Sequence, residues 1–162
     1  MSQEKTTPPS QAFVTPQTQI ALAIDTAYVI GQKGPATKSG KKVFMMDNHR
    51  SQNSTDEGGD ELSTVCKVGD TISWYVVPLD PTTGHTVEIY DWKFYDESQS
   101  YNIFGIPQDK PQKDPNYPSY WLGVLQKPSM NQKVCYNLYI NIHYGNGQVY
   151  PFTWDPFLIV NP

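Results

Sequence analysis

Residues 134–147 read VCYNLYINIHYGNG, and their alternation is the strongest secondary-structure signal in the chain. One face collects apolar and aromatic side chains, which are Val134, Tyr136, Leu138, Ile140, Ile142 and Tyr144. A period of two is that of a β-strand with one buried face. The turn GNG (145–147) and the stretch QVYPFTWDPFLIV (148–160) that follows it predict a β-hairpin.

Strand patterns recur through the rest of the chain. IALAID (20–25) and GDTISWYVVPLDP (69–81) alternate clearly, and weaker patterns cover 42–47, 62–68, 86–95 and 121–126. Frequent Gly, Pro and Asp turns separate these short strands, and no segment sustains the spacing of an amphipathic helix. The sequence therefore predicts an all-β fold, an antiparallel, jelly-roll-like β-sandwich over residues 19–162 that follows a flexible N-terminal tail, 1–18.

Composition excludes several functional classes. Only 17% of the residues are charged and the net charge is -4, so no basic surface for nucleic acid is expected. The polar N-terminus lacks the apolar core of a Sec signal peptide or membrane anchor, which predicts a cytoplasmic protein; release by another route stays open. Cys66 and Cys135 are then expected to be reduced and buried, with a disulfide as the alternative.

Two long segments carry no strand pattern, namely the acidic residues 47–61 and the proline-rich residues 105–120. Loops of this length are often functional. The acidic loop has enough oxygen ligands for Ca²⁺, and Asp56, Glu57 and Asp60 are the candidates, although the spacing is not that of an EF-hand. A solvated loop without metal is the alternative interpretation.

Motifs for catalysis are absent from the sequence. There is no nucleophile elbow, zinc-binding helix motif, P-loop or dinucleotide fingerprint. His49, His85 and His143 are widely spaced, which indicates structural or surface histidines. Paired carboxylates of a glycosidase remain an alternative, and the candidates are Asp91, Asp96, Glu97 and Asp155. We therefore do not expect an enzyme.

Aromatic residues beside polar ones suggest a binding site for sugars. Trp74 lies within an alternating strand and is expected in the core, whereas Tyr117, Tyr120 and Trp121 lie in or beside the proline-rich loop, where rings tend to be exposed. A pyranose stacks its apolar face on such rings while polar side chains bind its hydroxyls. The candidate glycan-binding residues are Asp47, Asn48, His49, Tyr120, Trp121, Trp154 and Asp155.

The C-terminal residues YPFTWDPF (150–157) allow two interpretations. The step Asp155-Pro156 forces an extended backbone and predicts a bend or bulge, after which a last strand pairs with 134–144. In the structural interpretation Asp155 caps a turn and Trp154 closes one end of the sandwich. In the functional one, both line a ligand site.

Four stretches together resemble a known family. IALAIDTAYVI (20–30), VFMMD (43–47), GDTISWYVVPLD (69–80) and FTWDPFLIVNP (152–162) are similar, in this order, to the AidA/PixA-type bacterial inclusion body proteins. The resemblance implies a cytoplasmic bacterial β-sandwich protein that in some cases accumulates as crystalline inclusions, with links to quorum sensing and host association. It implies no enzyme, and it agrees with carbohydrate binding.

These observations lead to a main hypothesis and two alternatives. The first is a non-enzymatic, lectin-like protein that binds a glycan or glycoconjugate and gains avidity as a homo-oligomer. The alternative is a self-assembling storage or inclusion protein without a specific ligand, and a glycosidase is third. The chain is not expected to insert into membranes.

Overall fold

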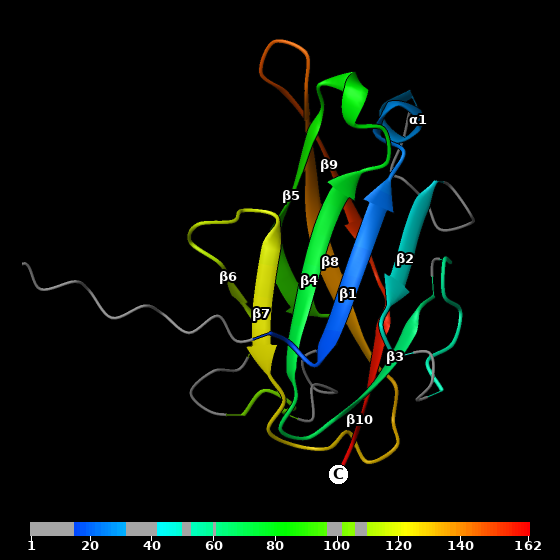
Figure 1. The fold of residues 1–162 in the computed structure, drawn as a ribbon, viewed down its shortest axis with the longest axis vertical. Coiled ribbons are helices and arrows are strands. Elements are labelled where there is room, and N and C mark those ends of the chain that lie inside the picture. The colour runs from blue at the N-terminus through cyan, green and yellow to red at the C-terminus, as the bar shows by residue number, and fades with distance from the viewer. Residues whose placement is uncertain (1–14, 32–41, 50–52, 60, 97–101, 106–109) are drawn as a thin grey trace, which may run out of the picture.

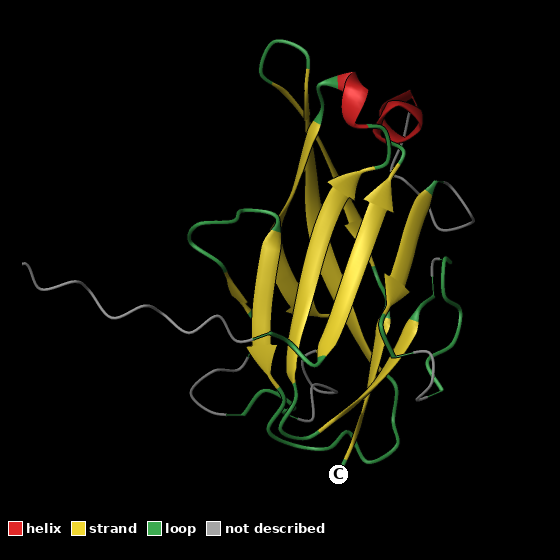
Figure 2. Cartoon of the chain, viewed as in Figure 1, coloured by secondary structure: helices red, strands yellow, loops and turns green. Residues whose placement is uncertain are grey.

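The computed structural model describes residues 15–31, 42–49, 53–59, 61–96, 102–105 and 110–162. Within these residues the protein is built almost entirely from β-strands, arranged as two sheets that face each other (Figures 1 and 2). The all-β sandwich predicted from the sequence is therefore confirmed. No helix in the described ranges has the length and apolar character needed to span a bilayer. Most of the predicted N-terminal tail lies outside the described residues, and the first strand begins at Thr18.

The first sheet has the strand order β2-β1-β4-β7-β6 and faces the viewer in Figure 1. Its strands are β1 (Thr18–Ile24), β2 (Val43–Asp47), β4 (Thr71–Pro78), β6 (Gln112–Lys113) and β7 (Tyr120–Val124). One row of partners, Asp47, Ile20, Trp74 and Trp121, crosses four of these strands and points into the sandwich. The alternate residues therefore point outward.

The second sheet has the order β3-β10-β8-β5, and β9 also pairs with β8. Its strands are β3 (Ser63–Lys67), β5 (Thr86–Phe94), β8 (Val134–Tyr144), β9 (Gln148–Trp154) and β10 (Phe157–Asn161). The hairpin predicted around Gly145–Gly147 is confirmed, because β8 and β9 pair from Tyr144 and Gln148 onward. The bend predicted at Asp155-Pro156 is also present, since β9 ends at Trp154 and β10 resumes pairing with β8 at Phe157.

Three details differ from the sequence-based prediction. The sheets are mixed rather than wholly antiparallel, because β1 runs parallel to β4 and β3 runs parallel to β10. A short helix, α1 (Thr26–Gly31), follows β1; it is too short to show helical periodicity, and the Asp25 carboxylate accepts the Tyr28 N–H at its start. The proline-rich segment contributes the two-residue strand β6. A 3-10 turn, η2 (Pro81–Thr83), precedes β5.

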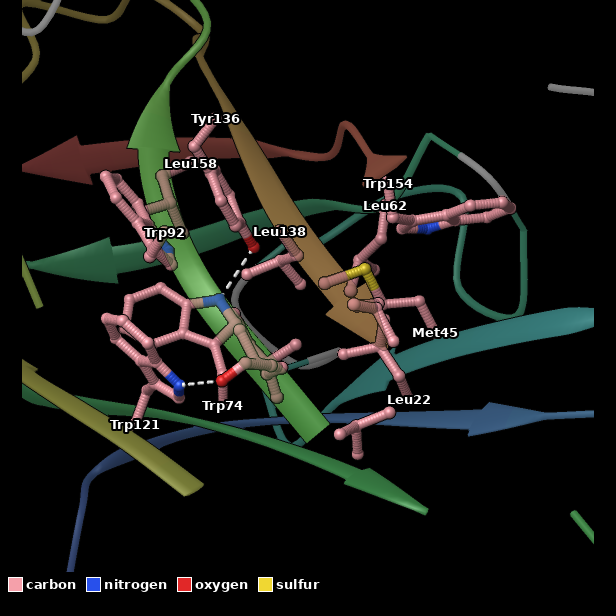
Figure 3. Packing of buried hydrophobic residues seen from close by; sticks show 14 of the residues in the cluster. Leu22, Met45, Leu62, Trp74, Trp92, Trp121, Tyr136, Leu138, Trp154 and Leu158 are labelled. Carbon is pink, nitrogen blue, oxygen red and sulfur yellow. Dashed lines mark hydrogen bonds between the residues drawn. The ribbon is translucent and has the colours of Figure 1, made fainter. Parts of the chain in front are cut away.

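The core between the sheets is rich in large rings. Trp74 of the first sheet makes edge-to-face contacts with Trp92 and Tyr136 of the second, at centroid distances of 5.7 Å in both cases. Figure 3 shows the Trp74 indole nitrogen directed at the Tyr136 hydroxyl, and the hydrogen bond between them measures 2.9 Å. This aromatic contact ties the two layers together.

Both cysteines are thiols in the structure. Cys66 is buried and its Sγ donates to the Ile159 carbonyl at 3.4 Å. Cys135 is only partly buried, contrary to expectation, because it occupies the outer face of β8. Burial raises the pKa of the Cys66 thiol, with smaller contributions from the carboxylates of Asp70 and Asp47.

Candidate functional site

The outer face of the first sheet is uncharged. Strands β1, β2, β4 and β7 alternate their side chains between the core and solvent, so that every second residue reaches this face. The outward side chains are Gln19, Ala21, Ala23, Phe44, Met46, Thr71, Ser73, Tyr75, Val77, Tyr120, Leu122 and Val124. All of them are neutral, and most are apolar or aromatic.

Pairing across the strands aligns four of these side chains in one row. Met46, Ala21, Tyr75 and Tyr120 are successive partners on β2, β1, β4 and β7. The rings of Tyr75 and Tyr120 meet edge to face with their centroids 6.4 Å apart. Tyr75 is 46% exposed, so this row is open to solvent.

A hollow of about 570 Å³, here named the tyrosine hollow, opens on the same face. Its walls are Pro16, Gln19, Ile20, Ala21, Ser73, Tyr75, Tyr117 and Tyr120. Tyr117 comes from the turn before β7, where the Asp114 carboxylate accepts the backbone N–H of Asn116 at 2.8 Å and of Tyr117 at 3.2 Å. The turn holds the Tyr117 ring 61% exposed at the edge of the hollow.

Asn48, a predicted glycan ligand, instead fastens the chain at the start of β1. Its side-chain oxygen accepts the Gln19 N–H at 2.8 Å, and its side-chain nitrogen donates to the Gln17 carbonyl at 2.9 Å. Both ends of the amide are therefore engaged within the protein. The segment that Asn48 fixes carries Pro16 and Gln19, two walls of the tyrosine hollow.

His49 is buried and acts on the same segment. Its Nε2 lies 2.8 Å from the Gln17 carbonyl oxygen, and its Nδ1 lies 3.0 Å from the Val65 carbonyl oxygen of β3. The Asp47 carboxylate accepts the His49 backbone N–H at 2.8 Å. The predicted triplet 47–49 thus forms a clamp on the segment at the start of β1, and His49 also connects this segment to β3 of the second sheet.

The other predicted site residues are separated by the fold. Trp121 is only 5% exposed, and its indole nitrogen donates to the Ile89 carbonyl at 2.7 Å (Figure 3), so the expectation of an exposed ring is wrong for this residue. Trp154 is 4% exposed and belongs to the second sheet. Asp155, at the β9–β10 junction, is half-buried, and its backbone carbonyl accepts from Cys135. Tyr120 is the one residue of the predicted set that lines the hollow.

The described residues of the acidic loop do not form the group of ligands that a calcium site requires. Asp56 and Glu57 are exposed, and Asp60 lies outside the described residues. Across the ranges that the structure describes, no group of three or more His, Cys, Asp or Glu side chains is placed to hold a metal ion. Calcium binding stays a prediction.

Charged side chains cluster where β5 of the second sheet lies beside β6 of the first. The Glu88 carboxylate contacts His143 Nε2 at 3.0 Å and Lys113 Nζ at 3.1 Å, beside an open hollow of about 470 Å³. Partial burial raises the pKa of Glu88, but hydrogen bonds from His143 and Lys113 outweigh burial and hold the pKa below its usual value. Asp91, a candidate glycosidase carboxylate, is ion-paired with Lys93 and Lys110.

Most walls of the tyrosine hollow are not predictable from the sequence. In β4, Tyr75 directly follows the core residue Trp74. Successive residues of a strand point to opposite faces, so the alternation identifies Tyr75 as outward-facing. The juxtaposition of Tyr75 with Gln19 and Tyr120 depends on the parallel pairing of β1 with β4 and on the register of β4 with β7. Neither pairing is encoded in local periodicity.

Comparisons with known proteins place the fold. The structure is similar to a crystal structure of the inclusion body protein PixA from Burkholderia cenocepacia J2315, with a TM-score of 0.64 over 96% of this chain and 100% of that one. The sequences are 16% identical, so the similarity supports the resemblance to inclusion body proteins at the level of the fold. That neighbour is named as an inclusion body protein and not as an enzyme.

A comparison with curated proteins gives no significant match. A family model described as a domain of unknown function (DUF8788) matches residues 16–149, and the chain belongs to this family.

Proposed function

We propose that this protein associates with copies of itself into ordered assemblies through the outer face of the first sheet. The observation that carries the proposal is the continuous uncharged surface on β2, β1, β4 and β7, with Met46, Tyr75 and Val124 exposed on it. Exposed apolar patches rimmed by polar residues mark interaction sites. The shared fold with an inclusion body protein supports self-assembly as the outcome.

The size of this face predicts a weak contact. Four strands about 4.8 Å apart, which are 5 to 8 residues long, cover about 20 by 20 Å. Side chains that project from the sheet add to the area of this face, but the total is still less than the roughly 800 Å² per partner of a stable interface. Association is therefore expected to need high protein concentration, as in a packed inclusion, and to be reversible on dilution.

The distribution of charge favours this face over the opposite one. Glu88, Asp91, Lys93 and His143 all lie on the second sheet, where desolvation on contact would be costly. The outer face of the first sheet has no charge to desolvate. Tyrosine, which is enriched at interfaces, provides a large contact area at little cost in side-chain entropy.

Two matched variants test the proposal. Tyr75 on the proposed face is 46% exposed, and Val149 on the β8–β9 hairpin is 45% exposed. Tyr75→Glu should weaken association by about tenfold or more, since burying an unpaired charge costs more than the roughly 1.4 kcal/mol that a factor of ten represents. Val149→Glu adds the same charge elsewhere and should leave association near that of the unmodified protein. Sedimentation velocity over a concentration series measures both, and equal behaviour of the two variants would reject this interface.

Glycan binding is a second candidate, and the tyrosine hollow favours it. Tyr75, Tyr117 and Tyr120 offer rings for the apolar face of a pyranose, and Gln19 offers hydrogen-bonding groups beside them. An assembly formed through another face of the protein would raise the avidity of such a shallow site. A glycan array probed with and without EDTA tests this candidate and any role of calcium. Binding that Tyr117→Ala abolishes would support the hollow, and a blank array in both buffers would reject glycan binding.

A further inference from the structure

We propose that the Met130 side chain of one copy inserts into the tyrosine hollow of a second copy, so that copies join head to tail. Met130 lies on the turn between β7 and β8, and residues 128–132 around it carry no charge. The inference rests on the proposed self-association and deepens it, because it names the second surface of that contact.

Met130 occupies a turn position that suits a different residue. The Gln132 N–H donates to the Ser129 carbonyl at 2.9 Å, and the two residues between them have positive φ, 57° at Met130 and 62° at Asn131. Such a turn favours Asn or Gly, because the Met side chain is strained at positive φ. The Met130 side chain is 72% exposed, so packing within the described chain does little to offset this strain. Strained backbone of this kind clusters at functional positions.

Ser129 holds the turn firmly against the second sheet. Its side chain is fully buried, and its hydroxyl donates to the Gln132 carbonyl at 2.8 Å and accepts the Val160 N–H of β10 at 2.9 Å. The Ser129 N–H donates in turn to the Val160 carbonyl at 2.9 Å. Because the turn is already fixed, little backbone entropy is lost when a partner buries its exposed side chain.

The turn and the tyrosine hollow lie on different parts of the surface. The turn is bonded to β10 of the second sheet, whereas the hollow opens on the outer face of the first sheet. In Figure 1 the segment between β7 and β8 runs along the lower end of the sandwich. A contact between turn and hollow therefore joins two different patches. Such a heterologous contact leaves one turn and one hollow free in each pair of copies, so that an array can grow.

The chemistry of the hollow suits methionine. Tyr75, Tyr117 and Tyr120 line it, and a thioether sulfur makes favourable contacts with aromatic rings. The unbranched Met side chain also adapts to an irregular hollow. Neither the walls of the hollow nor residues 128–132 bring a charge into the contact. The exposed Met130 of a second copy is therefore a matching occupant.

Two substitutions of Met130 separate association from folding. Met130→Gly removes the side chain and should leave the melting temperature unchanged or higher, because glycine adopts a positive φ without strain. In sedimentation velocity over a concentration series, this variant should associate about tenfold or more weakly, because the contact loses a buried apolar side chain. Met130→Leu keeps an apolar side chain of similar size and should associate nearly as the unmodified protein does. A Met130→Gly protein that associates like the unmodified protein would overturn the proposal.

Mixing two variants tests the head-to-tail geometry. Met130→Gly keeps the hollow, and Tyr75→Glu keeps the methionine. Each variant alone should remain a monomer at concentrations where the unmodified protein grows beyond a dimer. Their equimolar mixture should form pairs that do not grow. A mixture that sediments like the separate variants, or an unmodified protein that stops at a dimer, would overturn the head-to-tail contact.

The same variants distinguish failure of this inference from failure of the proposed function. If Tyr75→Glu weakens association and Met130→Gly does not, the outer face of the first sheet is the interface and Met130 is not its partner. If Tyr75→Glu associates like the unmodified protein, the proposed function fails as well.

Discussion

The indole nitrogen of Trp74 in β4 donates a hydrogen bond of 2.9 Å to the hydroxyl oxygen of Tyr136 in β8. Both side chains are fully buried, and the bond joins the two sheets at the centre of the core. Burial also raises the pKa of the Tyr136 hydroxyl, which keeps that hydroxyl neutral.

Tyr136→Phe should therefore lower the free energy of unfolding by about 1–3 kcal/mol, because it leaves the buried Trp74 N–H without an acceptor. Urea denaturation followed by tryptophan fluorescence measures the change. Tyr95→Phe is the matched control, since Tyr95 is 66% exposed and its substitution should cost little. Equal stabilities of the two variants would show that the cross-sheet bond contributes nothing.

Trp121 and Tyr117 are close in sequence but should respond in opposite ways to truncation. Trp121→Ala removes a buried ring and should destabilise the fold by about 3–5 kcal/mol. Tyr117→Ala removes an exposed ring and should change stability by less than about 0.5 kcal/mol. Thermal unfolding distinguishes the two, and a Trp121→Ala protein as stable as the Tyr117→Ala protein would contradict the placement of Trp121 in the core.

The clamp at residues 47–49 predicts local as well as global effects. Asn48→Ala removes two hydrogen bonds to the backbone of Gln17 and Gln19, at a cost of about 1–2 kcal/mol. Amide hydrogen exchange should quicken most at Gln19, whose N–H loses its acceptor. Exchange at β8 should change only as much as global stability does. Unchanged exchange at Gln19 would rule out the clamp.

The hydrogen bonds of Glu88 and its ion pair with Lys113 predict that the stability of the fold depends on pH in the acid range. Because the folded-state pKa of Glu88 lies below the usual 4.5, its contribution is present above pH 4.5 and is lost as the pH falls through the folded value. Glu88→Gln should therefore be less stable than the unmodified protein at neutral pH. The difference should shrink as the pH drops below 4.5. A difference that stays constant or grows in acid would contradict this sign.

Much of the fold could be predicted from the sequence because period-two alternation runs along most of the long strands, although a register shift between Ile89 and Asp91 interrupts it in β5. The alternation of β8 and the GNG turn specify the hairpin, and Asp155-Pro156 specifies the break before β10. Parallel pairing of β1 with β4 could not be predicted, since those strands are separated by more than forty residues and pair through the global topology.

The candidate site was harder to predict because its residues meet only through register. Asp47, Asn48 and His49 have the polar groups of a sugar site, yet the fold turns most of those groups toward Gln17, Gln19 and Val65. Trp121 follows a proline-rich loop, but the pairing of β7 with β4 points it into the core. Composition identifies which side chains are present, whereas their partners depend on non-local pairing.

Sedimentation velocity of the unmodified protein, over a range of concentrations and at low and high salt, tests the central claim most directly. The proposed interface is uncharged, while the molecule as a whole carries a net charge of -4. Salt screens the repulsion between copies without weakening the contact itself. We expect the sedimentation coefficient to rise with protein concentration and to rise further, or stay constant, with salt. A monomer at every concentration, or association that disappears at high salt, would contradict self-assembly through the outer face of the first sheet.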